Sequence, residues 1–526
     1  MSDLGLDLRA ASMLLKQEMF GDWYRDPWGW PELTNVDFIA SLDPETDLGV
    51  NLKDSRTLGI NPHFHTFTVP KSFLGVRPAV VQDPVSRLLY SAAVGASATK
   101  LQSNLPDWVF GWRVRNEEIT TNRTEWPAYV DTLPREDADG FGLLIDLTSF
   151  FSSIDPVRLM SLVYRKLGKN ASAQVIERIV TAHHLLATRS GLPQRSFASA
   201  ILANIFLQPL DDALSSAQSN DQEITTVRRW MDDISAEGSE GALFQLMLTI
   251  QDRARQVGLE LNISKTHLDE VARTTDSLRV EALREVSVEL KRVRASAYTD
   301  VVETVPDLEN LLRFEDEILS FPASAPRPTI KAVLHSLQKH EQYDRIQEWA
   351  ASAKRMPQVA DTLGRYFRAA PHFENPFEAD QEPLSLWFTK YLKSTWGRQT
   401  WVTAQLALAF RADRLPSSVR QALREWLETS DDIHQIAIAT QRLCESDATT
   451  ARSIIRSRVD KVTDPLLLRI FALGLLQAGD DRSVVEAILH RDARNRLLHT
   501  FLNNTSWKSP AVVDDFSGNN VGDQEN

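Results

Sequence analysis

The sequence has very little cysteine and no long apolar run. Its only cysteine, Cys444, cannot form a disulfide within the chain, and such sparing use of cysteine is typical of a reducing cytoplasm. No stretch approaches the roughly 18 consecutive apolar residues of a membrane-spanning helix. The first residues, Met1 to Leu4, include an acid and lack the basic-then-apolar order of a signal peptide. We therefore expect a cytoplasmic protein with no membrane partner.

Basic residues are also scarce relative to acidic ones. The 526 residues include 58 Lys and Arg against 71 Asp and Glu, which gives a net charge of −13. This balance argues against indiscriminate binding to nucleic acid, because a protein that follows a phosphate backbone usually carries basic clusters. It still allows a local basic groove that grips a short duplex. The length is sufficient for two to four domains, each with its own core.

Two adjacent carboxylates, Asp232 and Asp233, follow residues 225–231, which favour β structure. A third, Asp146, ends the strand-like run Phe141–Ile145. If the two strands lie side by side, three acids gather at one sheet edge, where like charges about 4 Å apart repel by roughly 4 kcal/mol. Paired divalent cations relieve such repulsion and drive nucleotidyl transfer. An Asp-Asp pair alone more often marks a solvated turn, but the neighbouring motifs favour a metal site.

Several cations precede these carboxylates in the sequence. Lys71 and Arg77 flank a predicted turn where they could meet a triphosphate, and Arg113 supplies another positive charge. Each of them alone is more often a solvated surface charge. His63 and His65 stand near no cysteine or further histidine at zinc spacing, so we expect them to be structural.

Three further segments could surround a nucleotide. Phe151, five residues after Asp146, could lie beneath the sugar and exclude a 2′-hydroxyl, although core packing explains a lone phenylalanine equally well. The loop Gly191–Arg195 opens a helix whose N-terminus suits a phosphate or a templating base. Lys265 follows a later helix and could approach a leaving phosphate, or could simply be an exposed lysine.

The rest of the chain divides by composition. Three tryptophans near the N-terminus (Trp23, Trp28 and Trp30) are expected to fill a hydrophobic surface. After about residue 305, amphipathic helix-length segments follow one another, which suggests stacked helix pairs of an α-solenoid; the last expected helix spans Ser483 to Leu497. The expected divisions are an N-terminal extension (1–59), a mixed core (60–300), a helical domain (301–505) and a disordered acidic tail (506–526).

In their order and spacing, the segments between about residues 60 and 300 resemble the reverse transcriptase family. The match consists of a first catalytic motif, a Gly-Leu-Pro-Gln loop with its helix, an aromatic-x-Asp-Asp hairpin and a lysine loop, at residues 145–154, 191–211, 230–233 and 261–266. The resemblance implies an α+β polymerase right-hand core, with fingers and palm, followed by an all-α HEAT-like helical-repeat domain.

The resemblance also implies roles for individual residues. Asp146, the Leu147 carbonyl and Asp232 would hold two Mg²⁺ ions, with Mn²⁺ as a substitute, while Asp233 supports them from slightly further away. The dNTP would be bound by cations, an aromatic gate and the Gly-Leu-Pro-Gln loop. These implied substrate-binding residues are Lys71, Arg77, Phe151, Gln194, Arg195 and Lys265.

Two departures from the family pattern stand out. Trp230 replaces the usual tyrosine, and Arg195 stands where most relatives have a glycine that lets the backbone approach the template or the nucleotide.

A polymerase core joined directly to a helical tail is most similar to bacterial abortive-infection and other defence-associated reverse transcriptases. This resemblance implies that the protein synthesises DNA from dNTPs in antiphage defence. In some of these relatives the synthesis is primed by a protein hydroxyl and uses no ordinary template. We also expect a homo-oligomer. Two alternatives remain open: a reverse transcriptase that copies a dedicated small RNA, and a nonenzymatic nucleic-acid sensor with a decayed core.

Overall fold

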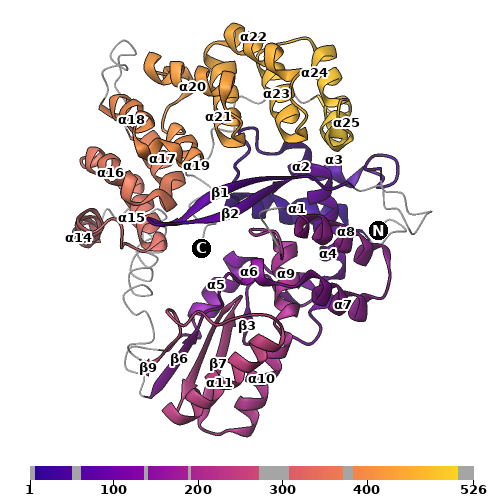
Figure 1. The fold of residues 1–526 in the computed structure, drawn as a ribbon, viewed down its shortest axis with the longest axis vertical. Helices are drawn as coiled ribbons and strands as arrows, with labels where there is room; N and C mark the ends of the chain where they lie inside the picture. Colours follow the sequence, from indigo (N-terminus) through magenta and orange to yellow (C-terminus); the bar gives the residue numbers. More distant parts are fainter. Residues whose placement is uncertain are drawn as a thin grey trace, which may run out of the picture.

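The chain folds into an α+β core followed by a helical domain (Figure 1). Within the ranges that the structure describes, no helix is long and apolar enough to cross a membrane. The expected disordered tail, apart from Ser506, and the expected domain boundaries near residues 59 and 300 lie outside these ranges. The computed structural model describes residues 6–49, 61–134, 140–186, 191–271, 307–370 and 383–506.

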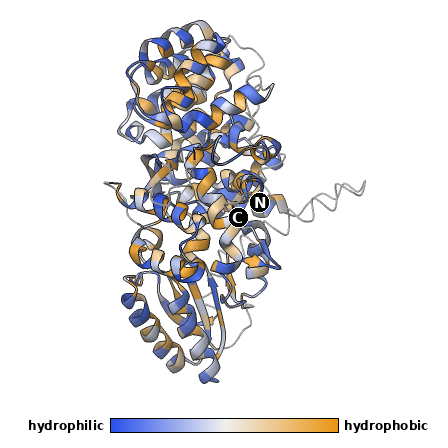
Figure 2. Cartoon of the chain, turned by 90° about the vertical axis from the view of Figure 1, so that its right-hand side faces the viewer, coloured by the Kyte–Doolittle hydropathy of each residue, from blue (hydrophilic) through white to orange (hydrophobic). Residues whose placement is uncertain are grey.

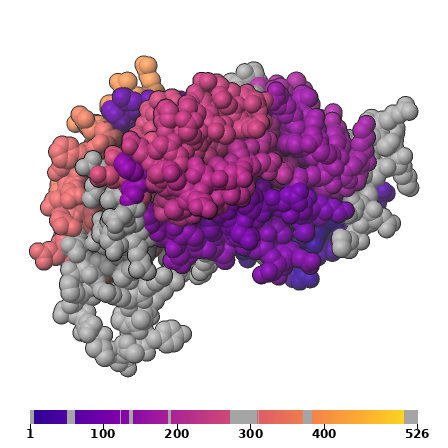
Figure 3. Space-filling model, turned by 90° about the horizontal axis from the view of Figure 1, so that it is seen from below, coloured from indigo at the N-terminus to yellow at the C-terminus, as the bar shows by residue number. Residues whose placement is uncertain are grey.

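A five-stranded sheet forms the centre of the core, in the order β3-β7-β8-β6-β9. β7 and β8 make an antiparallel hairpin, β6 pairs with β8 and β9, and β3 runs parallel to β7. The helices α10 (Gln208–Asn220) and α11 (Glu240–Gln256) cover the sheet, and their part of the sequence forms a large share of the surface seen from below (Figure 3). The strands span Val109–Phe110 (β3), Phe141–Ile145 (β6), Ile224–Trp230 (β7), Asp233–Gly238 (β8) and His267–Glu270 (β9).

A long hairpin and a buried helix precede the sheet. Asp83 caps α4 by accepting a hydrogen bond from the Ser86 amide, and Pro84 occupies its first turn. The single helix expected after the Gly191 loop is divided into α9 and α10, because Pro209 has no amide proton to continue the first helix. The elements are β1 (Phe64–Ser72), β2 (Gly75–Gln82), α4 (Pro84–Leu101), β4 (Val114–Arg115), β5 (Glu118–Ile119), α5 (Asn122–Val130), α6 (Phe150–Ser153), α7 (Pro156–Leu167), α8 (Ala171–His184) and α9 (Phe197–Phe206).

The helical domain is built of two stacked layers. One layer runs through α15, α17, α19, α21 and α23, the other through α14, α16, α18, α20 and α22, and each helix contacts the next member of its layer. Hydrophobic and hydrophilic residues alternate around these helices (Figure 2), as expected for paired amphipathic helices. The helices span Asp307–Ser320 (α14), Arg327–Lys339 (α15), Ile346–Ser352 (α16), Ala360–Ala369 (α17), Pro383–Lys393 (α18), Thr400–Ala407 (α19), Ser417–Thr429 (α20), Ile433–Ser446 (α21), Ala448–Val459 (α22) and Pro465–Gln477 (α23).

The last helix predicted from the sequence was wrong in its extent. The structure replaces the expected helix from Ser483 to Leu497 with α24 (Arg482–Leu489) and α25 (Arg496–Asn504), joined by a 3₁₀ turn. The Asp492 carboxylate accepts a hydrogen bond from the Arg494 amide and thereby starts that turn. Apolar residues continue at helical spacing across the break, so the pattern alone did not reveal it.

The N-terminal segment joins the core to the helical domain. It contains α1 (Leu8–Glu18), α2 (Pro31–Thr34) and α3 (Val36–Ala40). Its three tryptophans are buried, as predicted. The Trp28 indole donates to Gln477, and the Trp401 indole donates to the Trp23 carbonyl, in both cases over 2.9 Å. Arg469 of α23 is fully buried between Asp26 and Glu32 at 2.7 and 2.6 Å.

Direct contacts between the hairpin and the helical domain complete this junction. His63 and His65 each lie 3.0 Å from Asp464 at the start of α23. At the other end of the hairpin, the Phe73 ring lies against Trp396 with their centroids 5.9 Å apart. The hairpin is therefore fixed to the helical domain at both ends.

Candidate active site

One end of the sheet leads into α6 (Figure 1). Three carboxylates, those of Asp146, Asp232 and Asp233, lie at this end. Ile145 pairs with Ile234, so the strand end carrying Asp146 lies beside the strand start carrying Asp233. Asp232 lies in the two-residue turn that joins β7 to β8. This is the arrangement that the sequence predicts for two adjacent strands.

The electrostatics of this edge suit a cation. Burial raises the pKa of Asp232 to about 7, and the charges of Asp233 and Asp146 add to the shift. Asp233 is exposed and also lies near Tyr129, whose pKa is raised by burial and by Asp233. In the chain as described, no three acidic, histidine or cysteine side chains converge as tightly as the ligands of a metal do. The donor set nevertheless fits Mg²⁺ or Mn²⁺, because carboxylate oxygens are the ligands that these ions prefer.

The lysine loop holds Asp146 in place. The Lys265 ammonium donates to Asp146 Oδ1 over 2.9 Å, and Asn262 Nδ2 donates to Oδ2 over 2.8 Å. The Asn262 amide also donates to the Asp146 carbonyl over 2.7 Å, and Leu147 forms a β-bridge with Leu261. Lys265 thus lies at the carboxylate edge, and Asn262 is a positioning residue that the sequence analysis did not identify.

A buried ion pair supports the turn that carries Asp232. The Arg229 guanidinium donates to both carboxylate oxygens of Asp211 over 2.7 Å, to Asn204 over 2.9 Å and to the Met231 carbonyl over 2.6 Å. Burial raises the pKa of Asp211 even though Arg229 opposes the shift. The sequence analysis missed the role of Arg229, although an arginine inside an apolar strand is itself a signal of a buried partner.

The proposed gate residue is connected to the Gly-Leu-Pro loop through the backbone. Phe151 is partly exposed on α6 and packs edge-on against Phe150. Its carbonyl accepts a hydrogen bond from the Leu192 amide over 2.9 Å. A Cβ atom on Gly191, which has a φ of +71°, would lie only 2.0 Å from this carbonyl oxygen. Glycine is therefore required for the loop to approach α6 so closely.

Arg195 has a positive φ, the backbone conformation that glycine adopts most readily, at the position where the reverse transcriptase pattern has a glycine. Its φ is +64°, which costs a residue with a Cβ about 1–2 kcal/mol. Its guanidinium lies 5.2 Å from the centre of the Trp23 ring, and that of Arg77 lies 5.5 Å from the same ring. Cation–π contacts of this kind offset part of the strain. Gln194, the preceding residue, is partly buried.

Lys265 and Arg77 are the predicted cations that interact with the carboxylates: the Lys265 ammonium lies 2.9 Å from Asp146, and the charge of Asp232 acts on Arg77. Burial and the charge of Arg327 lower the pKa of Arg77, whereas the charge of Asp232 raises it. Lys71 is exposed near the hairpin tip and makes no ion pair within the described ranges. The antiparallel register explains the difference, because Arg77 pairs with Val69 while Lys71 lies in a bulge beyond it.

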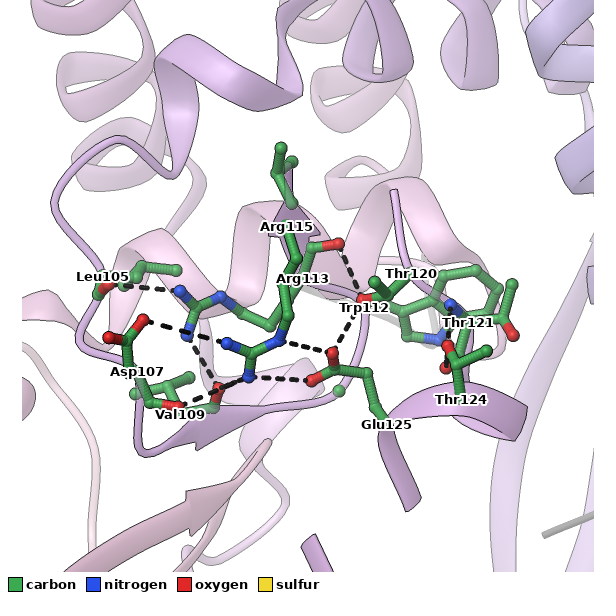
Figure 4. Close-up of polar contacts among 12 residues, drawn as sticks. Leu105, Asp107, Val109, Trp112, Arg113, Arg115, Thr120, Thr121, Thr124 and Glu125 are labelled. Atoms are coloured by element: carbon green, nitrogen blue, oxygen red, sulfur yellow. Dashed lines mark hydrogen bonds and ion pairs between the residues drawn. The ribbon is translucent and has the colours of Figure 1, made fainter. Parts of the chain in front are cut away.

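Two other arginines of this region make structural contacts instead. Arg87 is buried against Glu18 and Asp22, with nitrogen–oxygen distances of 2.7 Å to each. Arg113, which was expected to supply a further cation for the nucleotide, donates to the carbonyls of Leu105, Pro106 and Val109 (Figure 4). Burial lowers its pKa to about 10. Both guanidinium groups thus stabilise the core.

The N-terminus of α9, which the sequence suggested for a phosphate or a templating base, is occupied by the Glu18 carboxylate, which accepts a hydrogen bond from the Phe197 amide over 2.6 Å. The site therefore combines an acidic sheet edge, the Lys265 ammonium at that edge, the Arg77 guanidinium and the partly exposed ring of Phe151. Such a combination can bind a cation together with a phosphorylated ligand, because the cation and the arginine neutralise the phosphate oxygens. Comparison with protein-family models and with curated protein sequences found no match.

Proposed function

We propose that this protein is a DNA polymerase of the reverse transcriptase type, which transfers nucleotides from dNTPs to a hydroxyl group. The observation that supports this most strongly is the placement of Asp146 and Asp232 at one sheet edge, with the Lys265 ammonium 2.9 Å from Asp146. In this proposal the β1–β2 hairpin serves as fingers and the five-stranded sheet as palm.

The residues of the sheet edge have distinct roles in this proposal. Asp146, the Leu147 carbonyl and Asp232 would hold Mg²⁺ or Mn²⁺, with Asp233 in support. When bound, two such ions activate the attacking hydroxyl and stabilise the pyrophosphate leaving group. The protein holds its own carboxylates in position: the Asn262 side chain orients Asp146, and the loop backbone fixes its strand end.

Other side chains orient the nucleotide. Arg77 would bind the triphosphate through its guanidinium, which suits phosphate oxygens. The ring of Phe151 would limit the space beside the sugar and thereby disfavour a 2′-hydroxyl. Arg195 would restrict the approach of a template, because a long cation extends from a position where glycine would leave room. This supports protein-primed, untemplated synthesis, and we propose antiphage defence as its setting.

The test is incubation of the purified protein with Mg²⁺ and labelled dNTPs, singly and together, without added nucleic acid. We expect incorporation by the wild type and by Asp413→Asn, a control on the exposed surface of the helical domain, but not by Asp232→Asn. Label released only by protease would support protein priming. Incorporation only after addition of RNA and a primer would indicate templated copying. No incorporation under any condition would refute the polymerase and favour a nucleic-acid sensor.

The defence role has a separate test. Cells that express the wild-type protein should reduce phage plaque formation, and cells that express Asp232→Asn at the same level should not. Equal protection by both proteins would show that any defence is independent of the carboxylate edge.

A further inference from the structure

The turn of the β1–β2 hairpin carries bulky apolar side chains at the surface. Ser72 pairs with Gly75, so Phe73 and Leu74 form the two-residue turn between the strands. Turns of this length usually contain asparagine or glycine, which adopt the required backbone conformations easily. Leu74 is 89% exposed, and Val76 at the start of β2 is 59% exposed. Neither the chemistry of the turn nor burial in a core therefore explains these residues.

An aromatic pair lies beside this turn. The Phe73 ring packs against the Trp396 ring of the 3₁₀ turn Thr395–Arg398, with their centroids 5.9 Å apart and their planes tilted by 32°. Trp396 is 38% exposed, and Phe73 is partly exposed. The pair therefore presents aromatic surface to solvent where the hairpin meets the helical domain.

Three cations flank the aromatic pair. The Arg355 guanidinium lies 6.0 Å from the centre of the Phe73 ring. Lys71 stands two residues before Phe73, and Arg398 stands two residues after Trp396. All three cations are exposed, and none has a carboxylate partner among the residues that the structure describes. We refer to these five residues as the tip surface: Lys71, Phe73, Arg355, Trp396 and Arg398.

The charge of the tip surface differs from that of the whole chain. A net charge of −13 means that most of the molecule repels anions, so three unpaired cations at one place are a local feature. A ligand that matches both parts of this surface carries negative charge together with flat apolar groups. An acidic peptide would meet the cations but would leave the two rings without a planar partner.

We propose that the tip surface binds a single strand of nucleic acid. Its two rings stack on bases, and its three cations bind phosphates, which is the combination that sites for single strands use. A duplex would not use the rings, because its bases are already stacked on one another. The inference does not depend on the proposed function, since a polymerase and a nucleic-acid sensor both have to bind a strand.

The test measures binding in the absence of metal ions and dNTPs, so that no synthesis occurs. Fluorescein-labelled oligo(dT) and oligo(rU) of about 12 nucleotides are titrated with the wild-type protein, and anisotropy is recorded. DNA and RNA strands share the chemistry of this site, and the tighter-binding oligomer identifies the strand. An abasic oligomer of the same length, which has the same phosphates without bases, should bind at least about fivefold more weakly, because it cannot stack. Equal affinity for the abasic oligomer would overturn the proposal.

A single substitution tests the aromatic pair. W396A should weaken binding of the tighter oligomer at least about fivefold and leave binding of the abasic oligomer within about twofold, because the cations remain. The matched control is F244A, since Phe244 is a 47% exposed aromatic residue of α11, which covers the sheet. It should leave both affinities within about twofold. Equal weakening by W396A and F244A would contradict stacking at the tip surface.

A double substitution tests the cations and keeps both rings, so it remains informative if W396A loosens the hairpin. R355Q combined with R398Q should reduce the slope of log K against log salt by about 1.4, since each phosphate contact on a single strand contributes about 0.7. The control, R452Q combined with R456Q, removes the same charge from α22 and should leave the slope unchanged. Equal slopes for the two double variants would overturn the proposal. So would phosphatidylserine vesicles that bind through Arg355 and Arg398 when neither oligomer binds, because the tip surface would then recognise a lipid surface.

Discussion

The buried pair between Arg229 and Asp211 should control both the stability and the geometry of the β7–β8 hairpin. The side chains are 0% and 1% exposed, and two hydrogen bonds of 2.7 Å join them. The substitution Asp211→Asn keeps the size of the side chain but leaves the guanidinium charge uncompensated in the core. Breaking a buried pair in this way costs about 3–5 kcal/mol, which agrees with about 4 kcal/mol for two charges 4 Å apart at an effective dielectric of 20.

Amide hydrogen exchange shows where in the molecule this stability is lost. Amides of β7 and β8 should exchange about 10²- to 10³-fold faster in Asp211→Asn, since each 1.36 kcal/mol lost from the opening free energy is a factor of ten. The matched control is Asp413→Asn, whose partner Arg411 is 50% exposed and whose pair should contribute less than about 1 kcal/mol. If the hairpin amides of the two variants exchanged at the same rate, the ion pair would not support the turn.

Three further changes test other contacts. Gly191→Ala should destabilise the protein by at least about 2 kcal/mol in urea denaturation, because the new Cβ would lie 2.0 Å from an α6 carbonyl oxygen. The control is Gly479→Ala, which has a similar φ but open space around it and should cost only about 1 kcal/mol. Equal losses of stability in the two variants would contradict the steric argument. Lys265→Met should lower the Mn²⁺ concentration that gives half of the maximal rise in melting temperature, by up to about fivefold, because the lysine ammonium competes with Mn²⁺ for the Asp146 carboxylate. A higher Mn²⁺ concentration in the variant would show that the lysine assists Mn²⁺ binding. Burial would raise the pKa of Asp464, but His63 and His65 hold it below its ordinary 3.8, so this carboxylate adds stability above pH 3.8 and loses it as the pH falls. The difference in melting temperature between the wild type and Asp464→Asn should therefore be present at pH 5 and shrink below pH 4, and a difference unchanged at pH 3 would refute the linkage.

The parts of the site that local sequence could predict are those set by strand ends. Phe141–Ile145 reads as a strand because it is a short apolar run, and the Asp232-Asp233 turn follows a β-branched stretch, so their meeting at one edge required only that the strands pair. Nearness in the sequence predicted less well which side chains lie near the carboxylates. Lys71 and Arg77 flank the same turn, but the strand register places them at different points along the hairpin.

The contacts that sequence could not reveal join distant segments. Asn262 reads as an ordinary loop residue until its loop is seen beside Asp146. Trp23 reads as core, and it is buried, yet its ring also lies next to the guanidinium groups of Arg77 and Arg195. Patterns of hydrophobicity report which side chains are buried but not which element covers them, because that depends on tertiary packing.

The position of the helical domain and the positions of Arg77 and Arg195 depend on the same short segment. The carbonyl of Trp23 accepts the Trp401 indole hydrogen bond from α19, while its ring contacts the two arginines. Two residues later, the Arg25 guanidinium lies 3.8 Å from the Asp361 carboxylate of α17. A shift of the helical domain would therefore move these cations relative to the carboxylate edge. Because Arg469 of the helical domain is buried between Asp26 and Glu32 of this segment, the helical domain is packed firmly against the rest of the chain rather than joined to it only by a linker.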